Sequence, residues 1–283
     1  MNRRRLVRVP ASSANLGPGY DCLAAAVSLH LELEVEETGS FSVESDLAGV
    51  PLDHSNLCVQ AFERLHRADG LTFRISSEIP VASGLGSSAA AIVAGLVAAD
   101  HMYELDANLL PLAAEIEGHP DNVAGALMGG FVIVRDGDAQ RMEPPAGLEG
   151  VIAIPPEPVP THEARAALPD TIPVREAVAN IASASLLVLG LAKDDFSLIG
   201  AGLQDRIHQD RRAPLYERSI ELLGKWEELG SVGATISGAG PAVLFWCHWQ
   251  QTGNVLEAVS GAAEDCDVRR VQFVPGGADV RAL

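Results

Sequence analysis

The alternation of apolar and polar residues in the first part of the chain predicts a β-sheet. From Leu29 to Glu37, the sequence LHLELEVEE places an apolar side chain at every second position, which is typical of a strand with one buried face. Shorter apolar segments at 5–9, 41–45 and 71–77 predict further strands, and a helix is expected at about 56–67. These segments predict that the chain opens with an antiparallel sheet.

A helical pattern then replaces this alternation. The Ala-rich run that starts at Ser87 predicts a buried helix ending near Leu105, and a second helix is expected at 109–117. The segment FVIVR at 131–135 predicts one more strand after these helices. The first half is therefore expected to combine a sheet with buried helices.

A change of composition indicates a domain junction near residue 150. The segment 135–150, RDGDAQRMEPPAGLEG, is polar and rich in turn residues, and the prolines of 155–160, PPEPVP, predict an extended connector. The chain is therefore expected to divide into an N-terminal domain, 1–150, and a C-terminal domain, 151–283.

The elements predicted for the second half follow the order of a ferredoxin-like domain. When the helices between the first two strands are taken together, this order is β-α-β-β-α-β, and the whole chain is expected to be an α+β protein. The predicted elements are strands at 151–154, 233–237, 242–246 and 268–274, and helices near 161–168, 174–192, 194–204, 214–228 and 252–263.

The charge of the chain opposes a broad nucleic-acid surface. The 283 residues carry a formal net charge of −18, which disfavours binding to a phosphate backbone. The uncharged apolar run at 89–99 is about half of the roughly 20 residues that a membrane-spanning helix needs. We therefore expect no nucleic acid and no membrane among the partners.

The cysteines and the N-terminal segment indicate a cytoplasmic protein. The four cysteines stand too far apart for a C-x-x-C pair, and most are expected to be buried thiols in a reducing compartment. The basic start MNRRRLVRVP lacks the apolar core of a signal peptide. The eight histidines form no metal-binding spacing, so no zinc site is expected.

The segment PVASGLGSSAAAIVAGL, Pro80 to Leu96, is a candidate phosphate-binding loop. It fits the dinucleotide pattern G-x-G-x-x-G/A loosely, but Pro80 separates the strand from the glycines and no second strand precedes a candidate acid. A Walker A loop needs a lysine, and the two lysines of the chain lie far away.

What remains is a glycine-rich turn, capped by Ser87 and Ser88, that opens into a helix. Its backbone N–H groups and the helix dipole can hold a phosphate, and a metal ion would supply the missing positive charge. The alternative is a helix N-cap that binds no ligand.

Three sequence blocks together resemble the GHMP kinases, a superfamily of small-molecule kinases. They are VPASSANLGPGYDCLAAAV, PVASGLGSSAA and ISGAGPAVLFW, and they occur in the order of that superfamily. The resemblance implies the GHMP kinase fold, with an N-terminal domain like domain 2 of ribosomal protein S5 and a C-terminal ferredoxin-like domain. It also implies ATP and Mg²⁺ as cofactors.

Within this superfamily the chain is most similar to the homoserine kinases. PASSANLGPGYD contains no lysine, and EGHPDNVAGALMGGFVI, PTHEARAALP and QDRIHQDRR also resemble that group. The resemblance implies transfer of a phosphoryl group from ATP to the side-chain hydroxyl of L-homoserine, which gives O-phospho-L-homoserine for threonine biosynthesis. It further implies a homodimer.

Homoserine carries a carboxylate, an ammonium group and a hydroxyl, so its site needs a cation, an anion and a group that orients the hydroxyl. The resemblance places Asp21 at the ammonium group and Asn15 at the hydroxyl, although both residues also suit backbone turns. Arg165 and Arg212 are candidates for the carboxylate, because a guanidinium group can bind a carboxylate through two hydrogen bonds. The residues expected at the substrate are Asn15, Asp21, Asn122, Thr161, Arg165 and Arg212.

The nucleotide is expected on the glycine-rich loop, with Asn56 at the adenine, although an N-cap role would also explain Asn56. Mg²⁺ is expected on Ser88 and one glutamate. Glu115 and Glu117 are two residues apart and point to different faces of a helix; we favour Glu115, with Glu117 as the alternative. The expected nucleotide-binding residues are Asn56, Pro80, Val81, Ala82, Ser83, Gly84, Leu85, Gly86, Ser87, Ser88, Ala89 and Ala90.

Phosphoryl transfer depends mainly on alignment and charge stabilisation, so a strong base is optional. We expect Asn15 and Asn122 to align the hydroxyl while Ser88 and Glu115 serve the metal, with Asp121 as the alternative base. The backbone of the C-terminal SGAGPA segment would close over the phosphate loop. The rival functions are another small-molecule kinase of the superfamily and an inactive sensor with the same fold.

Overall fold

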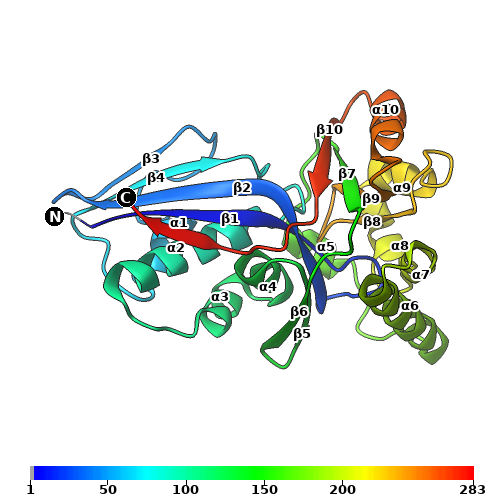
Figure 1. Ribbon diagram of the computed structural model, residues 1–283, viewed down its shortest axis with the longest axis horizontal. Coiled ribbons are helices and arrows are strands. Elements are labelled where there is room, and N and C mark those ends of the chain that lie inside the picture. Colours follow the sequence, from blue (N-terminus) through cyan, green and yellow to red (C-terminus); the bar gives the residue numbers. More distant parts are fainter. Residues whose placement is uncertain (1–2) are drawn as a thin grey trace.

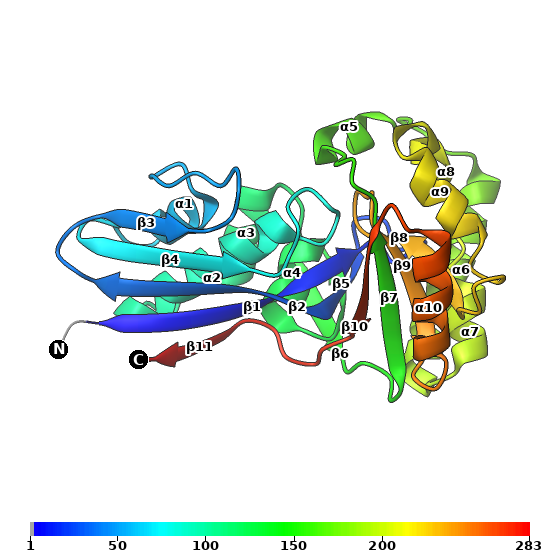
Figure 2. The same ribbon diagram turned by 90° about the horizontal axis from the view of Figure 1, so that it is seen from above.

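The computed structural model describes residues 3–283 and contains two β-sheets, each covered by helices (Figure 1). The first sheet is built mainly from the N-terminal half, and the second sheet takes its first strand from residue 148 onward. The view from above shows helices α1 to α4 beside the first sheet and helices α5 to α10 around the second (Figure 2). The two halves meet end to end, and the pocket described below lies between them.

The first sheet has seven strands in the described chain, in the order β11-β1-β2-β4-β3, with β5 beside β2 and β6 beside β5. Strands β3 and β4 run parallel because a helix connects them, whereas the other pairs are antiparallel, as predicted. The strands are β1 (Arg4–Ala14), β2 (Leu23–Glu37), β3 (Ser42–Ser45), β4 (Leu71–Ser77), β5 (Phe131–Arg135), β6 (Asp138–Met142) and β11 (Asp279–Ala282).

Helices cover one face of this sheet, and the helix after the glycine-rich loop lies at its centre. That helix, α2, is buried around most of its circumference because alanines and glycines allow close packing, which confirms the sequence prediction. The alternation at 29–37 is also confirmed, since Leu31 and Leu33 of β2 are buried and Glu32 is exposed. The helices are α1 (Leu57–Glu63), α2 (Ser87–Tyr103), α3 (Leu109–Glu117) and α4 (Asp121–Met128).

The second sheet confirms the predicted ferredoxin-like arrangement. Its order is β10-β7-β9-β8 with every pair antiparallel, so the first and third strands in the chain lie in the middle. Its strands are β7 (Leu148–Ile154), β8 (Gly233–Ile236), β9 (Val243–His248) and β10 (Asp267–Gln272).

Most helices of the second half lie on the outer side of this sheet, whereas α5 lies toward the junction with the first half (Figure 2). One of them, α6, is long and apolar enough to cross a membrane by length and composition, but one side of it packs against α7 inside the protein. The helices are α5 (Thr161–Ala166), α6 (Val174–Lys193), α7 (Phe196–Gly202), α8 (Gln209–Arg212), the 3₁₀ helix η1 (Ala213–Leu215), α9 (Glu217–Gly224) and α10 (Thr252–Ala262).

A continuous apolar core joins the two halves. Phe131 of β5, Trp246 of β9 and Phe273, just after β10, form an aromatic cluster with ring centroids 4.9 to 5.9 Å apart. None of these three residues is more than 5% exposed. This cluster fixes the second sheet against the first and so holds the pocket between them in shape.

Four elements were not predicted: β6, α4, α8 and β11. The most consequential is β11, which pairs with β1 in the first sheet. The assignment of its residues, 279–282, to the C-terminal domain is therefore corrected, since the chain returns to the first sheet after β10. Strand β11 is mostly exposed and carries no alternating apolar pattern that would predict it.

Candidate active site

A pocket with an internal volume of about 390 Å³ lies where the two halves meet. Its walls combine the turn after β1, the loop before α2, the start of α4, helix α5 and residues 238–239 after β8. Side chains far apart in the sequence therefore face one common space.

The loop before α2 requires both of its glycines. Gly84 and Gly86 have φ angles of +85° and +68°, which residues with a side chain rarely adopt. A Cβ atom at Gly84 would overlap the carbonyl oxygen of Ser237, and one at Gly86 would overlap Ser12 Oγ. The glycines thus allow the loop to contact the second half on one side and β1 on the other.

The first turn of α2 presents backbone N–H groups at the pocket. Gly86 is the N-cap residue, and no side chain in the described chain accepts a capping hydrogen bond there. Ser87 and Ser88 are the first helical residues, so the prediction that they cap the helix is wrong. Because no acidic side chain stands in this turn, the N–H groups and the helix dipole remain available to an anion.

The turn after β8 closes over the loop, as predicted for the segment SGAGPA. The backbone N–H of Ala242 donates to the carbonyl oxygen of Ser83 at 3.0 Å, and Ser237 Oγ donates to that of Gly84 at 2.8 Å. The same segment also joins β8 to β9 as a hairpin. The segment therefore both contacts the phosphate loop and forms the hairpin turn between β8 and β9.

Ser88 contacts Glu117 rather than Glu115. Ser88 Oγ lies 2.6 Å from each carboxylate oxygen of Glu117, which is the last residue of α3. Glu115 lies on the exposed side of α3 and pairs with Arg64 at 3.0 Å. The prediction of Glu115 at this site is corrected to Glu117, because residues two apart on a helix face different directions.

Burial raises the pKa of Glu117, and the hydrogen bond from Ser88 opposes that shift. A hydroxyl beside a carboxylate suits Mg²⁺, which needs few protein ligands when water and phosphates complete its shell. Within residues 3–283, no group of three or more His, Cys, Asp or Glu side chains is placed to hold a metal ion. Glu117 is thus the one carboxylate that contacts Ser88 among the described residues.

The start of α4 contributes an oriented amide and a carboxylate. Asn122 Oδ1 accepts a hydrogen bond of 2.9 Å from Ser12 Oγ, which fixes the orientation of the Asn122 side chain. Asp121 is 2% exposed, and one of its oxygens lies 3.4 Å from His119 Nδ1. The Asp121 carboxylate raises the pKa of His119, and burial opposes this shift.

Asp21 and Arg165 form a bidentate ion pair across the pocket. Two nitrogens of Arg165 donate to the two oxygens of Asp21 at 2.9 and 2.7 Å, and Arg165 also donates to Tyr20 Oη at 3.1 Å. The pair is about one-third exposed and therefore reachable from the pocket. Asp21 raises the pKa of Arg165, so the guanidinium group stays charged.

The amide of Asn15 is held from both sides in the turn after β1. Asn15 Oδ1 accepts the backbone N–H of Asp21 at 3.0 Å, and its Nδ2 donates to the carbonyl oxygen of Gly238 at 2.7 Å. Asn15 has a φ angle of +68°, a conformation that asparagine tolerates better than most residues. Asn15 thus has both expected roles: it stabilises the backbone turn after β1, and it lines the pocket.

Arg212 is 1% exposed and reaches the pocket from α8. Its guanidinium group donates to the carbonyl oxygen of Ala164 at 2.8 Å and lies 5.2 Å from the centre of the Tyr20 ring. Its Nη1 is 3.3 Å from His208 Nδ1, and burial lowers the pKa of that histidine. The Arg212 guanidinium therefore has a neutral neighbour.

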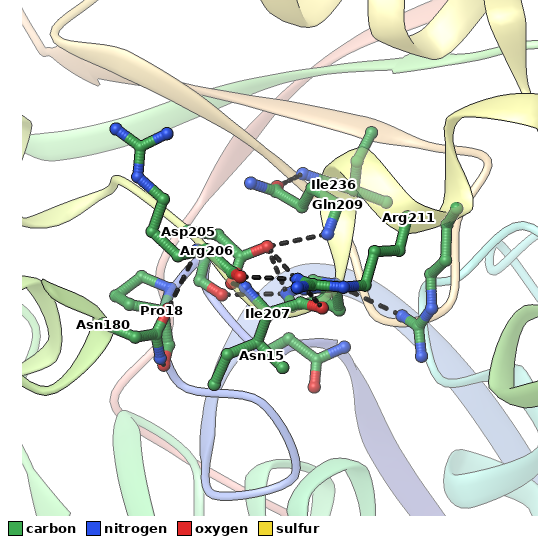
Figure 3. A network of polar contacts seen from close by, with 12 residues as sticks. Asn15, Pro18, Asn180, Asp205, Arg206, Ile207, Gln209, Arg211 and Ile236 are labelled. Carbon is green, nitrogen blue, oxygen red and sulfur yellow. Dashed lines mark hydrogen bonds and ion pairs between the residues drawn. The ribbon is translucent and has the colours of Figure 1, made fainter. Parts of the chain in front are cut away.

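A network of hydrogen bonds fixes the segment that carries Arg212 (Figure 3). The Asp205 carboxylate accepts the backbone N–H groups of Ile207, His208 and Gln209 at 2.7 to 2.8 Å. Asn180 of α6 accepts the N–H of Arg206 at 3.1 Å and donates to the carbonyl oxygen of Pro18 at 2.6 Å. The turn after β1 and the start of α8 are therefore held in one arrangement.

One end of the pocket is apolar. Leu31, Leu47, Ile75 and Ile79 line it, next to Asn56. Asn56 caps α1, since its Oδ1 accepts the N–H of Cys58 at 2.9 Å, which confirms the N-cap alternative; its position in the wall also keeps it beside any ligand there. A flat, apolar ring would fit this end.

Most of the predicted site residues line the pocket, and five do not. Leu85, Ala89 and Ala90 are buried in the core, Glu115 faces solvent, and Pro80 does not belong to the residues that line the pocket. The predicted residues that line the pocket are Asn15, Asp21, Asn56, Val81, Ala82, Ser83, Gly84, Gly86, Ser87, Ser88, Asn122, Thr161, Arg165 and Arg212.

Several contributors were not predicted from the sequence. Ser12 and Tyr20 contact Asn122 and Arg165, and His208 accompanies Arg212. Both Ser12 and Tyr20 stand within the block PASSANLGPGYD, whose other polar residues had already been assigned. No sequence pattern identified the residues of the apolar wall, because apolar residues that line a pocket alternate along a strand just as core residues do.

Comparison with known families assigns both halves to one superfamily. The family described as "GHMP kinases N terminal domain" matches residues 56–130, and that described as "GHMP kinases C terminal" matches residues 187–265. The first match includes the loop before α2, and the second covers the part of the ferredoxin-like half from α6 to α10.

Individual relatives extend this similarity over most of the chain. A homoserine kinase of Moorella thermoacetica is 38% identical over 87% of this chain and 88% of its own length, and one of Limosilactobacillus fermentum is 42% identical over 83% and 86%. The crystal structure of a homoserine kinase from Cytophaga hutchinsonii superposes with a TM-score of 0.87 at 30% identity, covering 98% of this chain and 97% of that one. A mevalonate kinase structure, 15% identical with a TM-score of 0.70, shares the fold.

Proposed function

The chain belongs to the GHMP kinases and, among them, to the homoserine kinases, and from this membership we propose that its pocket binds ATP and L-homoserine together. The reaction transfers the γ-phosphoryl group of ATP to the side-chain hydroxyl of L-homoserine and yields O-phospho-L-homoserine and ADP, in threonine biosynthesis. The observation that carries the site assignment is one pocket that has a helix N-terminus at one wall and the Asp21–Arg165 pair at another.

ATP would lie along the loop before α2. Its phosphates suit the N–H groups that follow Gly86, since no side chain in the described chain caps them. Its adenine ring suits the apolar end beside Asn56, where Leu31 and Ile75 form the wall. The pocket volume of about 390 Å³ lies in the range usual for small-molecule sites.

Mg²⁺ would be held by Ser88 and Glu117. Their hydrogen bond of 2.6 Å supports this assignment, because it places a hydroxyl oxygen and a carboxylate side by side, where both could bind one ion. When bound, the ion would supply positive charge to the phosphates, which this loop lacks because no lysine lines the described pocket.

L-Homoserine would replace the ion pair between Asp21 and Arg165. Its ammonium group can take the place of the guanidinium at Asp21, and its carboxylate can take the place of Asp21 at Arg165, so neither of these partly buried charges loses a partner. The buried guanidinium of Arg212 adds a second cation for the carboxylate. Thr161, one helical turn before Arg165, lies in the same wall.

Asn15 and Asn122 would align the substrate hydroxyl for attack. Hydrogen bonds to Gly238 and Ser12 already fix both amides, so little ordering is left for the moment of reaction. Asp121, the alternative base, accepts the backbone N–H of Asn122 at 2.8 Å and faces His119. These contacts occupy one oxygen of Asp121 with the backbone of its own helix, so we propose alignment by the two asparagines as the main contribution.

A coupled ADP-release assay tests this assignment with homoserine, mevalonate, shikimate and galactose, with and without Mg²⁺. We expect the kcat/KM for homoserine to exceed those of the other alcohols by about 100-fold or more, because only homoserine satisfies both charges of the pocket. Arg165→Gln should raise the KM for homoserine and leave that for ATP nearly unchanged, whereas the surface variant Arg64→Gln should change neither.

Turnover of another alcohol without turnover of homoserine would identify a different kinase of the superfamily. ATP binding without any turnover would identify an inactive sensor. The remaining parts of the proposal are a cytoplasmic location and a homodimer, which the family membership supports.

A further inference from the structure

Tyr20 contacts both arginines of the pocket. The centre of its ring is 5.8 Å from the Cζ atom of Arg165 and 5.2 Å from that of Arg212. Its hydroxyl accepts a hydrogen bond of 3.1 Å from Arg165 Nη1. Both arginines line the pocket, whereas Tyr20 does not. Tyr20 therefore supports the two cations from outside the space that a ligand would fill.

The turn after β1 brings the Tyr20 side chain to this position. The backbone N–H of Gly19 donates to the carbonyl oxygen of Asn15 at 2.8 Å, and Asp21 has a φ angle of +54°. Tyr20 and Asp21 are neighbours in this turn, and Arg165 Nη1 donates to both, at 3.1 and 2.9 Å. The phenol and the carboxylate thus bind the same nitrogen of one guanidinium group.

The hydroxyl of Tyr20 can keep its contact with Arg165 while a ligand replaces Asp21. An arginine Nη atom carries two hydrogens, so Nη1 can donate to Tyr20 and to one further acceptor. In the structure this acceptor is Asp21 Oδ2, and under the proposed binding mode it becomes the substrate carboxylate. Tyr20 would therefore hold the guanidinium group in orientation during the exchange, and a preorganised group loses less freedom when a ligand binds.

The ring of Tyr20 supports Arg212 together with His208. The two rings of Tyr20 and His208 have centroids 5.4 Å apart, and His208 Nε2 lies 2.8 Å from the carbonyl oxygen of Gly17. Because a carbonyl oxygen can only accept, Nε2 carries the hydrogen, and Nδ1 of the neutral ring can accept from Arg212 at 3.3 Å. The aromatic face stabilises the Arg212 charge without occupying its hydrogen-bond donors.

We propose that Tyr20 is a positioning residue for the substrate carboxylate: its hydroxyl orients Arg165 and its ring holds Arg212, so that both guanidinium groups stay directed at the pocket. This inference rests on the proposed function, because it assigns Tyr20 a part in the binding of L-homoserine. Tyr20→Phe removes only the hydroxyl, and Tyr20→Leu also removes the aromatic face. The two variants therefore separate the contact with Arg165 from the contact with Arg212.

Steady-state kinetics of the two variants test the proposal. We expect Tyr20→Phe to raise the KM for homoserine about 10-fold and Tyr20→Leu about 50- to 100-fold, because a hydrogen bond to a charged group and then a cation–π contact are lost. The kcat should stay within about threefold, since the lost contacts serve binding rather than the transition state alone, and the KM for ATP should stay unchanged.

Tyr103 provides the matched control. It carries the Cζ atom of Arg3 at 5.1 Å from its ring centre, yet it does not line the pocket. The substitutions Tyr103→Phe and Tyr103→Leu should therefore leave every one of these constants within about twofold of the wild type. An equal rise of the KM for homoserine in the Tyr20 and Tyr103 variants would contradict a specific role of Tyr20.

Two further measurements separate positioning from a general structural effect. The preference for homoserine over its decarboxylated analogue, 3-aminopropan-1-ol, should fall about 10-fold in Tyr20→Phe, because the analogue offers Arg165 no carboxylate. In an Arg165→Gln background, Tyr20→Phe should change the KM for homoserine by about twofold or less, since the hydroxyl acts through Arg165.

An equal loss with both alcohols, or a full 10-fold effect in the Arg165→Gln background, would overturn the positioning role. An active wild type with unaltered Tyr20 variants would overturn this inference alone. A wild type that turns over no homoserine would overturn the proposed function and this inference with it.

Discussion

Glu115 and Glu117 stand two positions apart on α3, yet only Glu117 reaches the pocket. Glu117 contacts Ser88, and Glu115 pairs with Arg64 at the surface. Glu117 is therefore the candidate functional residue, and Glu115, a glutamate on the same helix, is its matched control.

Glu117→Gln should raise the Mg²⁺ concentration needed for half-maximal activity by about 10- to 100-fold, because the carboxylate that we propose as a metal ligand becomes a neutral amide. Glu115→Gln should stay within about twofold of the wild type, since an exposed ion pair contributes little. Steady-state rates measured over a Mg²⁺ titration separate the two variants. Equal effects of both substitutions would refute the assignment of Glu117.

Repeating the Mg²⁺ titration at several pH values tests whether the buried Glu117 is the group that controls the Mg²⁺ requirement. Burial raises the pKa of Glu117, so its carboxylate binds a proton at a higher pH than an exposed glutamate does. As the pH falls, the Mg²⁺ requirement of the wild type should therefore rise, and it should level off as the pH increases. Glu117→Gln should show a much flatter pH dependence of this requirement.

Among the elements, α2 illustrates how a helix start becomes a binding site. Gly86 ends the loop in a left-handed conformation and lies against Ser12 Oγ, so the helix begins without a capping side chain. The N–H groups of the first turn are left for a ligand. A structural cap at this position would remove that capacity.

Gly86→Ala should lower kcat/KM for ATP by about 10- to 100-fold and the free energy of unfolding by about 2–3 kcal/mol, through strain and overlap with Ser12. Gly39→Ala is the control, because Gly39 has a φ angle of +87° but no atom within 4 Å of the added Cβ. Gly39→Ala should lower the free energy of unfolding by about 1 kcal/mol and leave catalysis unchanged. Chemical denaturation and ATP-dependent rates measure both, and a catalytically intact Gly86→Ala would contradict the proposed phosphate site.

Elements with a strong apolar pattern were predicted well. Helix α3 and strands β4 and β5 have the predicted bounds, and the alternation in β2 identified its buried face correctly. Strand β6 was missed because its sequence DAQRM has no apolar face, and it forms only an exposed hairpin with β5. Local patterns predict burial, and they fail where a strand is stabilised by pairing alone.

The candidate site was predictable in part for the same reason. The loop from Gly84 to Ser88 and the residues Asn15 and Asp21 stand in compact motifs that mark turns and helix starts. The choice between Glu115 and Glu117 depended on the rotation of α3 relative to α2, which spacing within one helix does not define. The apolar wall around Leu31 forms only when β2 and β4 meet the loop, so no local pattern distinguished it from core.

At the scale of the whole molecule, the two halves share one core. The aromatic cluster of Phe131, Trp246 and Phe273 joins β5 to the second sheet, and the same apolar cluster includes residues from both halves. Strand β11 adds a second connection when the chain returns to β1. We therefore expect the two halves to unfold together.

Phe273→Ala should lower the free energy of unfolding by about 3–5 kcal/mol and keep a single transition, because a buried aromatic ring is removed from the junction. Trp249→Ala is the control: Trp249 is 54% exposed, and its loss should change the stability by about 0.5 kcal/mol or less. Differential scanning calorimetry checks both. Two separate transitions in the wild type would show that the halves are independent.

The proposed role of the ion pair between Asp21 and Arg165 has a consequence for the selection of ligands. A ligand with only an amine or only a carboxylate would break this pair and satisfy one of its two members, leaving the other charge half-buried without a partner. An amino acid restores both. Under the proposed binding mode, the ion pair occupies the place of the substrate's ammonium and carboxylate groups, and alcohols that lack either group are expected to bind weakly.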